Sequence, residues 1–373
     1  MKTWRKIIPL AVLALASNAF AAESIKIGVA SALSGDLVSY GQPTERAVRL
    51  VVDHINANGG INGAEVKLLV EDDACKPEVA ANTATKLISE GAQVIIGHTC
   101  SSATKAALPV YTNENVIVMS ASATDSDLTE SGKYPNFYRT IAPNNAQART
   151  IVNFVVNTLL KDERYKKIAI IHDKGDYGKG LAEDAQETIR RGALADVVLF
   201  EGITPGAVDY SAVVQKIRRT RANAVIFGGY HPEASKIVTQ MRKKGMKTLF
   251  ISDDGVKDDT FIKIAGSHAE GVYATGPADV SDNPITKQYR QAYVTKYGSE
   301  PGAFFDNAVA AALALTNAIE KAGSTEADKV ADVLHNQVAV TPFGQIRFDL
   351  NGDATGVGYT VYEVKEGKFE QVE

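Results

Sequence analysis

The stretch that decides the fold of this chain is Val94-Ile95-Ile96-Gly97-His98-Thr99-Cys100-Ser101-Ser102. Residues 94–96 are β-branched and apolar, which predicts a short buried strand. Serine is favoured where helices begin, so a helix is expected to start near Ser101. A strand that leads directly into a helix is typical of α/β folds built on parallel sheets.

The same alternation of strand and helix continues on both sides of this stretch. Residues 44–57 place apolar side chains at helical spacing, and the glycine-rich run 59–63 ends that helix. The strands expected in this half of the chain are 25–30, 66–71, 94–96 and 116–120, and the expected helices are 44–57 and 78–90, with a third from residue 101.

A second series of strands and helices begins after the break at residues 142–145. Its expected helices are 146–160, 180–191, 210–220 and 233–244, and its expected strands are 167–172, 196–201, 224–227 and 248–252. The chain is then expected to change lobe near residues 271–277, to form a long helix at 306–321 and to end in a hairpin around 343–362. A chain of about 350 residues exceeds one ordinary core, so two α/β lobes are expected. Ligands of such sheets bind beyond the carboxyl ends of the strands.

Residues 1–21 have the three parts of a secretory signal peptide. Three basic residues precede an apolar run at 7–16, and Ala19-Phe20-Ala21 offers small residues for cleavage after Ala21. The apolar run is shorter than the ~20 residues that span a bilayer. We therefore expect an exported, soluble protein without a lipid anchor, and an uncleaved membrane anchor is the alternative.

Charge and motifs exclude several functional classes. The whole chain carries a net charge of −4, and loss of the three basic leader residues makes it −7. It has no basic patch with interleaved aromatic residues, so nucleic acid is not an expected partner. It also lacks the Gly-x-Ser-x-Gly, Gly-x-Gly-x-x-Gly, phosphate-loop and His-Glu-x-x-His motifs. Neither an enzyme nor a bound cofactor is therefore expected.

The chain contains two cysteines, Cys75 and Cys100. An even number in an exported protein indicates a disulfide. A catalytic pair of Cys100 with His98 is the alternative, although two positions on one strand end suit a nucleophile and its base poorly. Metal binding by Asp72, Asp73, His98 and the thiols lacks the spacing of a metal motif, so no metal is expected.

Two loops of the first half offer hydroxyl groups at the start of a helix. Ser101 follows one strand, and Ser122 and Thr124 follow the next. Free backbone N–H groups and the helix dipole favour an anion at this position. Capping of the helix by serine is the alternative. Two such loops on neighbouring strands can converge on a single carboxylate.

Three loops of the second half complement a positive charge. They contain Tyr177 within 173–178, Tyr230 within 228–233 and Asp254 within 252–255. Tyrosine faces attract a cation, and a carboxylate forms a charge-assisted hydrogen bond with an ammonium group. Taken singly, each of these segments is also compatible with an ordinary surface loop.

With these motifs in place, the chain resembles the leucine/isoleucine/valine-binding proteins of ABC importers, which are type I periplasmic binding proteins. The resemblance covers essentially the whole mature chain and is strongest at residues 72–75, 97–102, 172–178 and 228–233. It implies two Rossmann-like lobes joined by a three-segment hinge with crossovers near Ile141, Ala274 and Phe348. The lobes would comprise residues 22–141 plus 275–348 and residues 142–274 plus 349–373.

The resemblance also implies roles for individual residues. Cys75 and Cys100 would form the disulfide, which places Cys100 in the binding region. Ser101, Ser122 and Thr124 would hold the α-carboxylate of an amino acid. The backbone of Ser122, the hydroxyl of Thr124 and the carboxylate of Asp254 would hold its α-ammonium group. The aromatic residues would enclose the rest of the ligand: Tyr177 and Tyr230 from the second lobe, and Tyr40 and Phe304 at the side-chain end.

The expected function is that of a periplasmic, monomeric protein that captures a branched-chain or aliphatic amino acid by hinge closure and docks on a membrane permease. Asp254 stands where family members carry glutamate, Thr99 replaces an apolar residue, and Asp306 replaces an apolar aromatic residue. A basic or ω-amino acid bound with the help of Asp306, Asp253 and Thr99 is therefore an alternative, unless Asp306 points to solvent. A periplasmic amino-acid sensor with the same fold is another.

Overall fold

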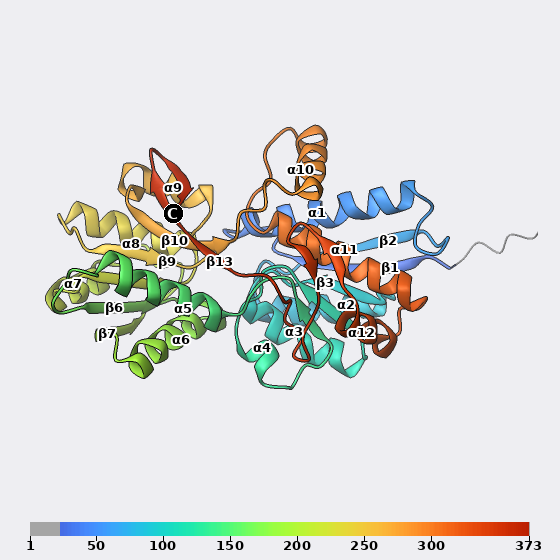
Figure 1. Ribbon diagram of the computed structural model, residues 1–373, viewed down its shortest axis with the longest axis horizontal. Helices are drawn as coiled ribbons and strands as arrows, with labels where there is room; N and C mark the ends of the chain where they lie inside the picture. The colour runs from blue at the N-terminus through green and yellow to red at the C-terminus, as the bar shows by residue number, and fades with distance from the viewer. Residues whose placement is uncertain (1–22, 373) are drawn as a thin grey trace, which may run out of the picture.

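A computed structural model describes residues 23–372 and consists of two lobes placed end to end (Figure 1). The first lobe is built on a five-stranded parallel sheet with the order β2-β1-β3-β4-β5. Its strands are β1 (Ile25–Ser31), β2 (Val66–Asp72), β3 (Val94–Gly97), β4 (Ile117–Ser120) and β5 (Phe137–Arg139).

Helices cover both faces of this first sheet because its strands are apolar on both sides. In β3, Val94 and Ile96 belong to the core beneath α1 and α11, whereas Ile95 belongs to the core beneath α2 and α3. The helices of this lobe are α1 (Val38–Ala57), α2 (Pro77–Ser89), α3 (Ser101–Asn113), α4 (Asp127–Glu130), α10 (Pro284–Tyr297), α11 (Phe305–Ala322) and α12 (Ala327–Asn336). A small hairpin joins β11 (Ala339–Thr341) to β12 (Gly344–Ile346).

The second lobe has a seven-stranded mixed sheet with the order β14-β13-β10-β9-β8-β6-β7. Its strands are β6 (Lys167–His172), β7 (Asp196–Gly202), β8 (Ala224–Gly228), β9 (Leu249–Ser252), β10 (Val272–Pro277), β13 (Tyr359–Lys365) and β14 (Lys368–Gln371). The last two strands pair antiparallel at the edge.

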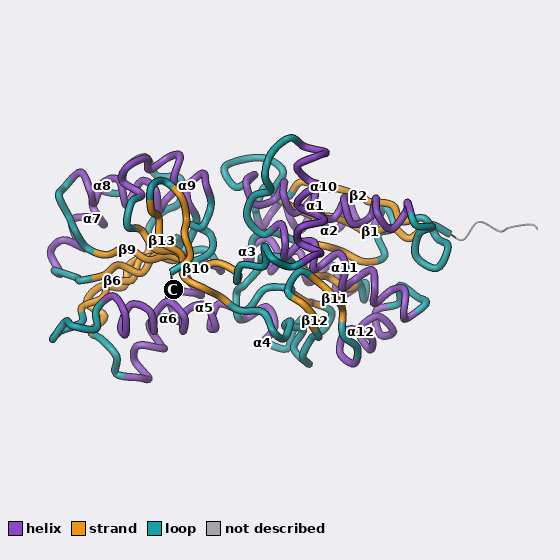
Figure 2. Tube along the Cα trace, turned by 45° about the horizontal axis from the view of Figure 1, so that its top comes forward, coloured by secondary structure: helices purple, strands orange, loops and turns teal. Residues whose placement is uncertain are grey.

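Helices also flank the second sheet on both sides, as the tube in Figure 2 shows. They are α5 (Asn144–Phe154), α6 (Asp176–Gly192), α7 (Ser211–Thr220), α8 (His231–Lys243) and α9 (Asp259–Ala265). Helix α5 continues into a π-helical turn (Val155–Leu159), and a 3₁₀ turn (Gly266–Ala269) follows α9.

The predicted fold class, two α/β lobes with parallel sheets, is confirmed. Several local expectations were wrong. The helix expected to begin at residue 180 begins at Asp176, and the single terminal hairpin is instead two separate hairpins. Residues 275–277, which we assigned to the first lobe, lie in β10 of the second sheet. The sequence patterns also failed to predict β5, α10 and α12.

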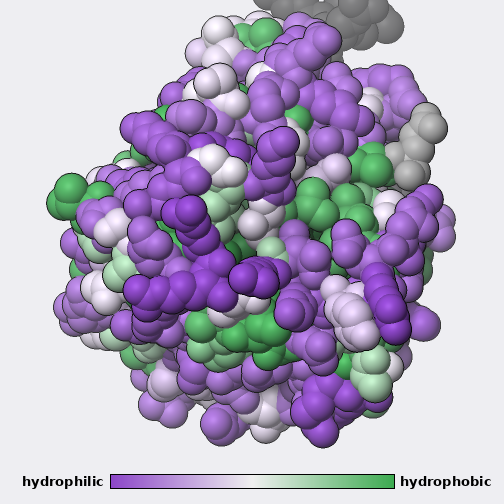
Figure 3. Space-filling model, turned by 90° about the vertical axis from the view of Figure 1, so that its left-hand side faces the viewer, coloured by the Kyte–Doolittle hydropathy of each residue, from purple (hydrophilic) through white to green (hydrophobic). Residues whose placement is uncertain are grey.

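The predicted signal peptide at residues 1–21 lies outside the described residues. Within residues 23–372, no helix combines the length and the apolar character that a membrane span requires. The end of the second lobe in Figure 3 is mostly hydrophilic with small hydrophobic areas, as is usual for a protein surface in water.

Candidate ligand-binding site

A narrow cavity lies between the two lobes, beyond the carboxyl ends of the parallel strands, and contains about 240 Å³ of empty space, openings to solvent included. The first lobe contributes hydroxyl groups and two aromatic rings, and the second contributes two tyrosines and a carboxylate. The cavity is lined by Tyr40, Thr99, Ser122, Tyr177, Tyr230, Asp254, Gly255 and Phe304. Six of these eight residues belong to the predicted site, and Thr99 and Gly255 were not assigned to it.

Two loops of the first lobe are joined by hydroxyl groups. Ser122 Oγ donates to the carbonyl of Thr99 over 2.7 Å, and Thr99 Oγ1 lies 2.7 Å from Ser31 Oγ. Ser101 Oγ accepts hydrogen bonds from the backbone N–H groups of Thr124 and Asp125. Ser101 therefore supports the loop that carries Thr124 and does not itself line the cavity.

Thr124 is buried behind the cavity wall, and its hydroxyl oxygen has no hydrogen-bond partner among the described residues. Buried polar atoms in native proteins are nearly always paired. Thr124 Oγ1 is therefore a buried hydroxyl whose acceptor and donor capacity the described residues leave unused.

Cys75 and Cys100 form a disulfide with a Cα–Cα distance of 5.4 Å. Cys100 lines a neighbouring groove and not the cavity itself. His98 Nδ1 lies 2.6 Å from Asp73 Oδ2, and His98 Nε2 lies 3.1 Å from Tyr111 Oη. The thiol of Cys100 is part of the disulfide, and both ring nitrogens of His98 are paired with Asp73 and Tyr111. The alternative of a catalytic Cys100–His98 pair is therefore excluded.

Asp72 has a structural role in the same region. Asp72 Oδ1 accepts the backbone N–H groups of Leu33 and Ala74, each over 2.8 Å, and so holds two loops. Within residues 23–372, no three histidine, cysteine or acidic side chains are grouped as metal ligands would be.

Two glycines bring the tyrosines of the second lobe together. A Cβ on Gly178 would lie 2.4 Å from the carbonyl oxygen of Gly228, so only glycine permits this approach of α6 to β8. Tyr177 and Tyr230 each adjoin this contact, and their ring centroids lie 5.2 Å apart. Tyr177 occupies the first turn of α6 and is not on a loop, contrary to our expectation.

Among residues 23–372, Asp254 is the only carboxylate that lines the cavity. Its Oδ1 accepts a hydrogen bond from Tyr177 Oη, whereas its buried Oδ2 has no partner among the described residues. Burial raises the pKa of this carboxyl to about 6. A cation next to Oδ2 would reverse that shift and complete the hydrogen bonding of the carboxylate.

Asp253 is buried but does not line the cavity. Its Oδ2 accepts the N–H of Gly229 over 2.8 Å, and burial together with the neighbouring Asp254 raises its pKa well above the ordinary value. Asp306 forms an ion pair with Arg290 on α10, over 2.5 Å. Neither carboxylate lines the cavity, so two of the three residues that suggested a basic or ω-amino acid ligand do not reach it. Asp306 is paired with the guanidinium of Arg290 and does not point freely to solvent.

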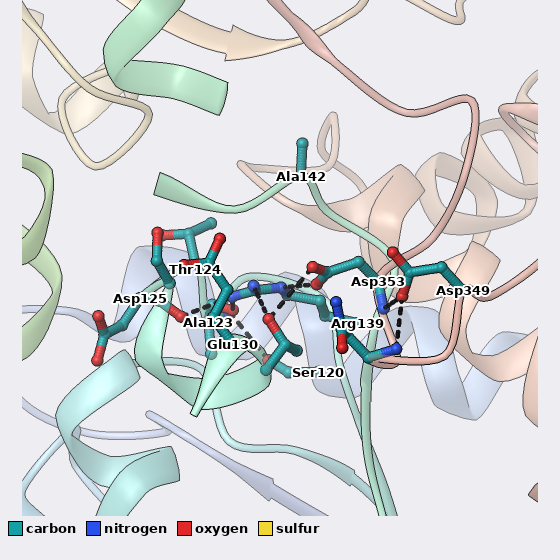
Figure 4. Close-up of polar contacts among 12 residues, drawn as sticks. Ser120, Ala123, Thr124, Asp125, Glu130, Arg139, Ala142, Asp349 and Asp353 are labelled. Carbon is teal, nitrogen blue, oxygen red and sulfur yellow. Dashed lines mark hydrogen bonds and ion pairs between the residues drawn. The ribbon is translucent and has the colours of Figure 1, made fainter. Parts of the chain in front are cut away.

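Arg139 is a supporting residue that the sequence analysis missed. It is fully buried at the end of β5, and its Nε contacts Asp353 Oδ1 over 2.5 Å. Its remaining nitrogens donate to the carbonyls of Ala123 and Asp125, which Figure 4 labels beside Arg139. They also donate to the hydroxyl of Thr129. This guanidinium therefore holds the loop that contains Thr124.

The two lobes contact each other directly around the cavity. Ser102 Oγ accepts the backbone N–H of Asp176 over 3.0 Å, and Ser126 Oγ donates to Asp184 over the same distance. The lobes are therefore closed on each other.

Comparison with known proteins agrees with this architecture. A family model described as "periplasmic binding protein" matches residues 24–368. A leucine-, isoleucine-, valine-, threonine- and alanine-binding protein of Pseudomonas aeruginosa is 34% identical over 356 residues, which cover 95% of this chain and 93% of that protein. The chain belongs to the leucine/isoleucine/valine-binding protein family. Members of this family are solute-binding proteins of the periplasmic type and not enzymes.

Two further proteins are similar to this chain over nearly their whole length. The leucine-specific-binding protein of Salmonella typhimurium is 33% identical, with 97% of each chain covered. A solved structure of the branched-chain amino acid substrate-binding protein LivJ from Streptococcus pneumoniae, in complex with isoleucine, is 27% identical with a TM-score of 0.82. It covers 94% of this chain and 99% of its own.

Proposed function

We propose that this protein is the periplasmic solute-binding component of an ABC importer for amino acids of the branched-chain or aliphatic class. The observation that carries the proposal is Asp254, which lines the cavity between aromatic rings and whose buried Oδ2 has no hydrogen-bond partner among the described residues. An α-ammonium group pairs with such a carboxylate, and an apolar side chain suits the rings. The relatives reported above are named for the binding of leucine alone or of leucine together with isoleucine, valine, threonine and alanine, and they support the same class.

In this proposal, Ser122 and Thr124 receive the α-carboxylate, and Ser101 supports their loop. Tyr177 and Tyr230 close over the ligand, and Tyr40 and Phe304 enclose its side chain. Capture occurs by hinge closure between the lobes, because contacts from both lobes favour the closed population. Residues 1–21 direct export to the periplasm, where the closed monomer docks on a membrane permease.

Calorimetric titration of the mature protein, unfolded and refolded to remove carried-over ligand, tests the proposal. We expect one-site binding of leucine, isoleucine, valine or alanine. Asp254→Asn should weaken binding by about 10- to 100-fold, because a hydrogen bond to a buried charge is lost. Asp306→Asn is the matched control and should leave affinity unchanged. Binding of arginine, ornithine or 4-aminobutyrate alone, or equal affinity in Asp254→Asn, would overturn the assignment.

A further inference from the structure

Phe304 separates the ligand cavity from a second cavity at the hinge. The second space measures about 450 Å³ and is called here the hinge cavity; its walls include Lys257, Arg290, Asp306 and Tyr362. Phe304 lines both spaces. Its ring therefore forms part of the partition between them.

The backbone holds this ring in an unusual conformation. Phe304 precedes α11 with a φ of +62°, a left-handed conformation that bulky residues rarely adopt. Such conformations persist where surrounding structure enforces them, often at ligand sites. On the cavity side, the ring packs against Tyr40 with a centroid distance of 5.7 Å. The ring is thus fixed across the side-chain end of the ligand cavity.

The hinge cavity contains a cationic group without an anionic partner. Among the described residues, Lys257 makes no ion pair, and its Nζ lies 4.1 Å from the ring centre of Tyr362. Arg290 is already paired with Asp306. Burial and the nearby Arg290 lower the pKa of Lys257, and the carboxylates of Asp279, Asp259 and Asp306 offset this only in part.

One turn of chain serves both cavities. Asp254 lines the ligand cavity, Lys257 lines the hinge cavity, and the N–H of Lys257 donates to the carbonyl of Asp254 over 3.2 Å. Asp254 and Lys257 are thus three residues apart on one turn, and each lines one of the two cavities that share Phe304.

We infer that Phe304 determines specificity by exclusion: its ring keeps longer amino acids, above all those with an anionic end group, from reaching Lys257 in the hinge cavity. This inference rests on the proposed function. Specificity of this kind comes from a steric barrier to the competing ligand and not only from contacts with the preferred one. Removal of the ring would merge the two spaces. The side-chain carboxylate of a longer ligand could then pair with the ammonium group of Lys257.

Titration of three variants with leucine, phenylalanine and 2-aminoadipate tests the inference. Phe304→Ala should weaken leucine binding several-fold and should tighten phenylalanine and 2-aminoadipate binding by at least about tenfold. Phe304→Ala combined with Lys257→Met should lose the gain for 2-aminoadipate and keep the gain for phenylalanine. Phe343→Ala, which enlarges only the hinge cavity, is the control and should keep wild-type selectivity.

The outcomes separate this inference from the proposed function. Unchanged selectivity in Phe304→Ala, with normal leucine binding by the wild type, would overturn the role of Phe304 alone. If the wild type bound none of these amino acids, both the proposed function and the role of Phe304 would be overturned. Phe304→Leu keeps an apolar side chain at this half-buried position and serves if the alanine variant does not fold. It should show a smaller shift of selectivity in the same direction.

Discussion

The hydroxyl of Tyr40, in the first lobe, lies 2.5 Å from Nδ1 of His231, in the second lobe. The same hydroxyl lies 2.5 Å from the carbonyl oxygen of Gly255. A carbonyl only accepts, so the single proton of Tyr40 must be donated to Gly255, and His231 must donate through Nδ1–H. This relay crosses the interface between the lobes, and burial lowers the pKa of His231 within it.

Tyr40→Phe should shift the protein towards the open state. The ring and its packing remain, but two hydrogen bonds across the interface are lost, each contributing about 1 kcal/mol. We expect leucine affinity to fall by up to roughly 30-fold in calorimetric titration, the equivalent of about 2 kcal/mol. Tyr138→Phe is the matched control, because Tyr138 Oη pairs with His335 over 3.0 Å within the first lobe. A similar loss of affinity in both variants would contradict a role in closure.

Ligand affinity should depend on the protonation of Asp254. Its pKa of about 6 in the ligand-free cavity means that a proton competes with the ammonium group of the ligand below that pH. We expect affinity for leucine to fall between pH 7.5 and pH 5, by up to about tenfold for each unit below 6. Titrations of Asp254→Asn should show no such fall, and a pH-independent wild type would exclude Asp254 as the ammonium partner.

Asp173 should make the folded protein less stable as pH rises. Burial raises the pKa of its carboxyl to about 7, although Oδ1 accepts the N–H of Gly175 over 2.9 Å. The folded state therefore binds this proton more tightly than the unfolded chain, and the associated stability is lost as pH rises from about 4 to about 7. Asp173→Asn should gain stability relative to the wild type between pH 5 and pH 8 in urea unfolding.

Asp209→Asn provides the control for that experiment. The hydroxyl of Ser211 lowers the pKa of the exposed Asp209 carboxyl, which stays ionised across the range from pH 5 to pH 8. The difference in stability between this variant and the wild type should therefore remain constant over that range. An equal pH dependence in both variants would show that the burial of Asp173 is not the cause.

Arg139→Met should destabilise the first lobe by about 3 kcal/mol, because Asp353 and three buried acceptors lose their donor. Ligand affinity should fall as well, since the loop that carries Thr124 loses its anchor. Lys296→Met removes an exposed ion pair with Asp53 and should cost less than about 1 kcal/mol. Urea unfolding and leucine titration of both variants provide the measurements, and equal losses would argue against the anchoring role.

Local patterns were sufficient for the repeated strands and helices of both lobes. Apolar runs such as residues 167–172 and 94–96 form strands because their side chains are buried on both sheet faces. The patterns were weaker where tertiary packing overrides propensity. Tyr177 falls in a helix because the close contact of Gly178 with Gly228 allows α6 to begin early against β8. The three residues of β5 were too few to give a periodic signal.

The sequence by itself determined the two-lobe α/β class, the disulfide and the residue types of the cavity, because these follow from periodicity, cysteine count and motifs. The tertiary structure alone decided which of those residues face the cavity. Ser101 lies behind it, Asp306 is held by Arg290, and Arg139 is buried beneath the Thr124 loop. The physical reason is that each orientation depends on hydrogen-bond and ion-pair partners distant in the chain, which no local pattern of residues encodes.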